Sequence, residues 1–162
     1  MSEILGERTA MGESDSGLGI VHLLREVTVE LALLQSEFAR ANGMHATDVR
    51  ALICVLDAER AGDLLTPGRL GAQLGLNSAG TTSVIDRLER AGHLRRLHDP
   101  DDRRRVRLRT TEQAVTLGQG HFGPLIAHVL DLLGTFDEAE VAAVRRFLTS
   151  VRDTARDRGG AC

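Results

Sequence analysis

Three consecutive arginines, Arg103, Arg104 and Arg105, follow the acidic pair Asp101-Asp102 past the middle of the chain. A guanidinium group pairs well with phosphate oxygens and stays charged at physiological pH. On a loop, such side chains can also enter a narrow minor groove of DNA, where the electrostatic potential is most negative. Asp102 is close enough in sequence to pair with Arg104 and hold its guanidinium outward. The alternative interpretation is a charged turn exposed to solvent.

A second group of candidate residues precedes the arginines by about twenty positions. Four small residues fall on one side, or its shoulder, of a predicted helix: Ser78, Ala79, Thr82 and Ser83. The apolar residues of that segment fall on the other side at 100° per residue. A helix with a slim, hydrogen-bonding face can enter a major groove about 12 Å wide. Asp86 and Glu89 lie further along this face and would repel phosphates, so we expect the N-terminal half to point at the bases. Asp86 is either an acceptor for a cytosine amino group or an ordinary surface acid.

The elements that position these residues are almost all helical. Apolar residues recur at three- and four-residue steps, which is typical of amphipathic helices. The predicted helices cover about 17–41, 47–62, 66–75, 77–91, 111–136 and 137–156, and a strand hairpin covers 93–109. Glycines and Pro124 are expected to loosen or kink the first half of the fifth helix.

Local signals define several helix ends. Thr47 or Asp48 is expected to cap the second helix, and Thr66-Pro67 to begin the third. Gly75 can adopt the left-handed conformation that ends a helix. Asp137 and Glu140 have the spacing of a capping box for the last helix.

Two short helices followed by a hairpin predict a helix-turn-helix with a wing. The expected fold class is therefore mainly α, a winged helix-turn-helix with a two-stranded β wing and a helical dimerisation region formed by the terminal helices. We expect a disordered tail over 1–15 and one domain over 16–156. Within this domain the predicted parts are dimerisation helices at about 17–41 and 111–156, a DNA-binding core at 47–110, the helix-turn-helix at 66–91 and the wing at 93–109.

The charge distribution supports a local binding site for a polyanion. All 20 basic residues are arginines. The net charge of −3 divides into −6 over residues 1–63, +5 over 64–111 and −2 over 112–162. A basic middle between acidic flanks is typical of a nucleic-acid-binding region. With four Phe and no Tyr or Trp, a stacking platform for single strands is not expected.

Here the sequence resembles the MarR family of bacterial regulators. The matching motifs are Leu70-Gly71-x-x-Leu74-Gly75-Leu76-Asn77, Thr82-x-x-Ile85-Asp86-Arg87-Leu88-Glu89-x-x-Gly92-x-Leu94-x-Arg96 and Asp99-Pro100-x-Asp102-Arg103-Arg104. One departure is Thr110-Thr111 where the family usually has Leu-Thr. The resemblance implies a homodimer, with the fourth helix as recognition helix and Arg104 as the minor-groove residue. It also implies that Arg87 contacts the DNA backbone or braces the motif, and that members often repress and respond to a small ligand or oxidant.

Other chemistry has weaker support. His22, His121 and His128 are weak candidates for a metal site, with no metal-binding motif around them. Cys54 lies among apolar residues and is expected in the core, and Cys162 is terminal. Two cysteines are too few for a disulfide scaffold. No phosphate-binding glycine loop or nucleophile motif is present, so no enzyme and no cofactor are expected.

Together these observations predict a cytoplasmic, homodimeric repressor of transcription that binds a palindromic site in double-stranded DNA and is released by a small ligand. The predicted DNA-binding residues are Ser78, Ala79, Thr82, Ser83, Arg87, Arg103, Arg104 and Arg105, with Asp102 supporting the wing. The alternatives are a metal- or ligand-sensing regulator that uses histidines, and a winged-helix module that binds another protein. No apolar stretch reaches the ~20 residues of a membrane span.

Overall fold

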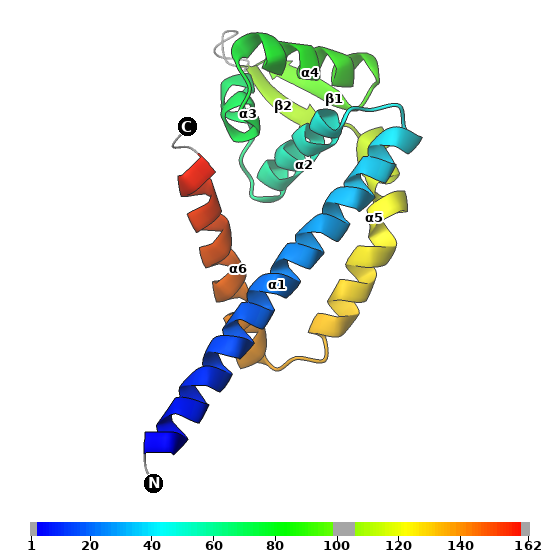
Figure 1. The fold of residues 1–162 in the computed structure, drawn as a ribbon. Helices are drawn as coiled ribbons and strands as arrows, with labels where there is room; N and C mark the ends of the chain where they lie inside the picture. The colour runs from blue at the N-terminus through cyan, green and yellow to red at the C-terminus, as the bar shows by residue number, and fades with distance from the viewer. Residues whose placement is uncertain (1–2, 99–105, 160–162) are drawn as a thin grey trace. The chain divides into compact units, whose positions relative to one another are not determined.

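The computed structural model describes residues 3–98 and 106–159 (Figure 1). The elements are α1 (Glu3–Ala41), α2 (Ala46–Arg60), α3 (Pro67–Leu74), α4 (Ser78–Arg90), β1 (Leu94–His98), β2 (Val106–Thr110), α5 (Glu112–Leu133) and α6 (Glu138–Gly159). The predicted wing tip, with Asp102, Arg103, Arg104 and Arg105, lies outside the described residues. The chain divides into two compact units, residues 1–115 and 116–162, where the sequence predicted one domain.

The first helix differs from its predicted extent. A disordered tail was expected over residues 1–15, but α1 begins at Glu3. No proline interrupts this stretch, and extending an existing helix adds one hydrogen bond per residue at a lower cost than nucleating a new one. The helix ends at Ala41, before Gly43 with its φ of 64°.

The core of the first unit is aliphatic, as the shortage of aromatic residues requires. Its fully buried members come from α2, α3, α4, both strands and the α2–α3 loop: Ala51, Val55, Leu65, Leu70, Val84, Ile85, Leu88, Leu94 and Leu108. Cys54 packs against this cluster, as predicted. In Figure 1 the two strands lie beside α2 and α4. The base of the wing therefore packs on the same core as the helix-turn-helix.

The helix ends of the helix-turn-helix follow the predicted signals. Thr66 accepts a bond from the Arg69 amide at 3.3 Å, which caps α3 ahead of Pro67. Gly75 ends α3 with a φ of 67°. Asn77 then caps α4 by accepting from the Gly80 amide at 2.8 Å. For α2 the prediction was wrong: His45 is the N-cap residue, and Asp48 accepts a bond from its amide at 3.1 Å.

The wing is a two-stranded antiparallel sheet. Its register pairs Leu94 with Thr110 at the base and His98 with Val106 toward the tip. The Leu108 amide also donates to the Leu65 carbonyl at 2.7 Å. Because that carbonyl precedes α3, the sheet is fixed to the start of the helix-turn-helix as well as to the core.

The second unit contains the rest of α5 and all of α6. The helix α5 is continuous through Pro124, where the sequence predicted loosening or a kink. The predicted capping box begins α6, because the Glu140 amide donates to Asp137 and the Asp137 amide donates to Glu140, both at 2.8 Å. The last helix continues to Gly159, past the predicted end at 156. Within the described residues, none of the helices combines the length and hydropathy that a membrane span needs.

Candidate nucleic-acid interface

The two sides of α4 differ as predicted. Thr81, Val84, Ile85 and Leu88 are buried. The four small candidate residues Ser78, Ala79, Thr82 and Ser83 are all exposed. The first two turns of α4 therefore present a narrow surface of hydroxyl and methyl groups, the shape and chemistry that base edges in a major groove require.

A close approach between α3 and α4 fixes how this surface is presented. A side chain at Gly71 of α3 would overlap the Thr81 hydroxyl of α4. Thr81 is 4% exposed, and its hydroxyl donates to the Asn77 carbonyl at 2.9 Å. Because glycine alone lacks a Cβ, the two helices can pack at this distance only with glycine at position 71.

Arg87 braces α4 against α2. Its Nη2 lies 2.6 Å from Oδ1 of Asp48, and its Nε donates to Oδ2 at 3.2 Å. Its Nη1 donates to the Ser83 hydroxyl at 3.0 Å. The hydrogen bond with Asp48 raises the pKa of Arg87 above its ordinary value. Of the two roles that the family resemblance implied, the structure supports the brace, and a contact of Arg87 with DNA stays a prediction.

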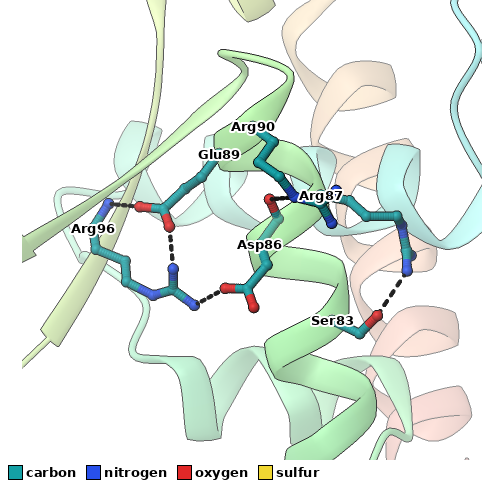
Figure 2. A network of polar contacts seen from close by, with 6 residues as sticks. All are labelled: Ser83, Asp86, Arg87, Glu89, Arg90 and Arg96. Carbon is teal, nitrogen blue, oxygen red and sulfur yellow. Dashed lines mark hydrogen bonds and ion pairs between the residues drawn. The ribbon is translucent and has the colours of Figure 1, made fainter.

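Asp86 and Glu89 of α4 share one cation from the wing (Figure 2). Arg96 of β1 places Nη2 2.7 Å from Oδ1 of Asp86, and its Nη1 forms an ion pair with Glu89. The Arg96 amide also donates to Glu89 at 2.9 Å. Asp86 is thus a partner of the wing, and the repulsion of phosphates expected from these two carboxylates is reduced.

The base of the wing contains the one departure from the family pattern. The Thr110 hydroxyl lies 3.0 Å from Oε2 of Glu59, so this threonine joins β2 to α2. Thr111 donates to the Gly92 carbonyl at 2.7 Å and accepts from the Ala114 amide at 3.2 Å. It therefore caps α5 and connects the end of α4 to the start of α5.

His93 lies at the same junction, between α4 and β1. Its side chain is buried, and among the described residues its Nδ1 has no hydrogen-bond partner. Burial lowers the pKa of His93 below its ordinary value. Burial at this junction therefore favours the neutral imidazole over the charged one.

The histidines proposed as weak metal candidates do not form a recognisable site in the described part of the chain. No group of three or more His, Cys, Asp or Glu side chains is placed there to hold a metal ion. His22 lies on α1, whereas His121 and His128 lie on α5, where the His121 ring packs edge-on against Phe122 with centroids 4.8 Å apart.

Three supporting residues were not given their roles by the sequence analysis. Asp48 was seen only as a helix cap, Arg96 only as a motif position, and Glu59 not at all. Asp48 lies 39 positions from its partner Arg87, and Arg96 lies 10 positions from Asp86. Glu59 lies 51 positions from Thr110. No periodicity in the sequence links residues over such separations.

Comparisons with known proteins agree with this geometry. The MarR family model matches residues 46–106, from the start of α2 to the start of β2. An HTH-type transcriptional regulator of Bacillus subtilis, YcgE, is 30% identical over 133 residues, which cover 82% of this chain and 84% of the relative.

Solved structures support the fold. A mutant of MepR from S. aureus has a TM-score of 0.68 at 17% identity and is matched over 83% of this chain and 95% of its own. FabT of Streptococcus pneumoniae, solved in complex with DNA, has a TM-score of 0.58 at 21% identity over 85% of this chain and 96% of its own. With its helix-turn-helix, its wing and a relative of this similarity along most of its length, the chain belongs to the MarR family of transcriptional regulators.

Proposed function

We propose that this regulator is a cytoplasmic repressor that binds a palindromic site in duplex DNA as a homodimer and is released by a small ligand. In this proposal Ser78, Ala79, Thr82 and Ser83 enter the major groove. Arg103, Arg104 and Arg105 of the wing tip, with Asp102 in support, hold the flanking DNA. The observation that carries the proposal is the exposed, slim N-terminal half of α4 with its acids paired to Arg96.

The hydrogen bond from Arg87 orients the Ser83 hydroxyl and so affects which groups of a base it can contact. A hydroxyl has one donor proton and two acceptor lone pairs. Because Arg87 already donates to the Ser83 oxygen, the hydroxyl proton remains available for an outside acceptor. In the major groove, the acceptors are N7 and O6 of guanine, N7 of adenine and O4 of thymine. We therefore expect Ser83 to donate to a purine or a thymine, while its second lone pair can still accept from the amino group of adenine or cytosine.

The apolar surface of the terminal helices supports the dimer. Eight large apolar side chains stay exposed in the described part of α1: Leu18, Ile20, Val21, Leu23, Val27, Val29, Leu31 and Leu33. Others are exposed on α5 and α6 and in the loop between them, including Ile126, Phe136 and Phe147. Surface of this extent usually marks an interface with a partner. A two-fold dimer would place the recognition helices about 34–36 Å apart, which matches two half-sites one DNA turn apart.

A binding assay tests the proposal directly. Duplex DNA from upstream of the chain's own gene is titrated by fluorescence anisotropy, with a random duplex of equal length as competitor. The parent chain should bind the upstream duplex preferentially, and Thr82→Glu should abolish that preference because it places a carboxylate against the groove. Ala61→Glu, which adds the same charge at an exposed position directly after α2, is the control and should bind like the parent.

The same assay checks the wing and the alternative function. Arg104→Ala should weaken binding without lowering the melting temperature. A folded parent chain that binds no duplex would reject the DNA-binding role and favour the protein-interaction module instead. Tight binding by Thr82→Glu would reject α4 as the recognition helix.

A further inference from the structure

Three arginines share one face of the wing. The register places Arg95 directly opposite Arg109, and Leu97 opposite Arg107. Opposite residues of an antiparallel pair point to the same side, and so do residues two apart along one strand. Arg95, Arg107 and Arg109 therefore lie together on one side of the sheet, and we call this set the wing arginine face.

The other side of the same sheet faces the fold over most of its length, up to the exposed His98. Leu94 and Leu108 on that side are buried in the core. Arg96, also on that side, pairs with Asp86 and Glu89 of α4. The wing arginine face is consequently turned away from the core, and Arg95 and Arg109 are exposed.

The wing arginine face has no counter-charge within the part of the chain that the structure describes. Acidic partners are present for Arg60, Arg69, Arg87, Arg96 and Arg152. Among the described residues the three members of this face have none, and neither do exposed arginines such as Arg40 and Arg50, so the distinguishing feature of the face is its grouping of three arginines. Like charges directly opposite each other in a sheet are destabilising. An arrangement that opposes folding and leaves permanent cations uncompensated indicates an anionic partner outside the chain.

We propose that the wing arginine face binds the phosphate backbone of duplex DNA, in addition to the contacts of α4 and of the wing tip. This inference rests on the proposed DNA-binding function. Three guanidinium forks within about 5–7 Å of one another at their Cβ atoms suit a run of phosphate oxygens. Because Arg96 fixes β1 to α4, this face is held at a defined position relative to the recognition helix. Such contacts carry no sequence information.

Salt dependence of binding measures phosphate contacts without knowledge of the operator. A random-sequence duplex of about 40 base pairs is titrated between about 50 and 200 mM salt with the parent and with the triple variant Arg95→Gln/Arg107→Gln/Arg109→Gln. Each lost phosphate contact should reduce the slope of log K against log salt by about 0.9. The triple lysine variant keeps the charge and should keep the slope. Arg50→Gln/Arg60→Gln, at exposed positions of α2, removes arginines outside the wing, α4 and the terminal helices; this control should leave the slope unchanged.

The outcomes separate this inference from the proposed function. A parent that binds no duplex overturns both. A parent that binds with a steep slope, together with a triple glutamine variant of the same slope, overturns only the role of the wing arginine face. The single variant Arg95→Gln, at an exposed position, supplies the same test if the triple variant does not fold. It removes one contact from each subunit, so the slope for the homodimer should change by about 1.8. Binding of an acidic polypeptide such as polyglutamate, lost in the triple variant while the DNA slope is unchanged, would assign the face to a protein partner instead.

Discussion

Arg87 of α4 and Asp48 of α2 form a two-point ion pair, with Nη2 2.6 Å from Oδ1 and Nε 3.2 Å from Oδ2. The Asp48 side chain is 4% exposed and that of Arg87 is 32% exposed. The pair thus joins α4 to the core, with Asp48 buried and Arg87 partly at the surface. Because Arg87 also donates to Ser83, the pair links the stability of the core to the presentation of the proposed DNA-binding surface of α4.

Asp48→Asn should lower the free energy of unfolding by about 1.5–3 kcal/mol, because a buried charged hydrogen bond is lost and a guanidinium is left without its partner. Urea denaturation measures this. Asp57→Asn on the same helix is the matched control. The Asp57 side chain is 66% exposed, and its ion pair with Arg60 is long, with Oδ1 3.8 Å from Nη1. It should change stability by less than about 0.5 kcal/mol. Equal effects of the two substitutions would contradict the brace.

Gly71→Ala should destabilise the chain by about 1–3 kcal/mol, because the new methyl group overlaps the buried Thr81 hydroxyl and forces α3 away from α4. Gly68→Ala on the same helix meets no atom within 4 Å and should be neutral or stabilising. Thermal melts compare the two. Adding Thr81→Ala to the Gly71→Ala chain should restore part of the lost stability, because it removes the overlapping hydroxyl. A Gly71→Ala chain as stable as the parent would disprove the close approach.

Stability should fall when the pH is lowered below about 7, in part because of His93. Its pKa is lowered in the folded chain from an ordinary value of 6.5, so the unfolded chain takes up a proton at a higher pH than the folded chain. The unfolded state is therefore favoured as the pH falls through 6.5 toward the folded-state pKa. Urea denaturation at pH 7.5, 6.5 and 5.5 should show this loss for the parent and a smaller one for His93→Leu. An equal loss of stability in the parent and in His93→Leu would contradict this role of His93.

Arg96→Gln should weaken DNA binding more than it weakens the fold. The substitution leaves Asp86 and Glu89 without their cation beside the DNA-binding surface, while the partly exposed ion pairs contribute about 0.5–1.5 kcal/mol to folding. Combining it with Asp86→Asn and Glu89→Gln should restore part of the affinity by removing the carboxylates. Anisotropy titrations of the three chains measure the effect. If Arg96→Gln binds as tightly as the parent, neutralisation of these acids is irrelevant to binding.

The sequence alone was sufficient for the local features of this protein. Thr66-Pro67, Gly75 and the capping box at Asp137 and Glu140 each act within a few residues, so their outcome depends little on the rest of the fold. The same holds for the exposed small residues of α4, because helical periodicity separates them from the buried ones. The charge difference between the middle of the chain and its flanks is likewise a property of composition.

Only the tertiary structure decided how these parts support one another. The partner of Asp48, the pairing of Arg96 with two acids of α4 and the contact of Thr110 with Glu59 join residues from different elements. The gathering of three arginines on one face of the wing follows from the strand register. Such relationships depend on which elements pack together and at what distance, and the alternation of residue types along a single segment contains no information about its partner.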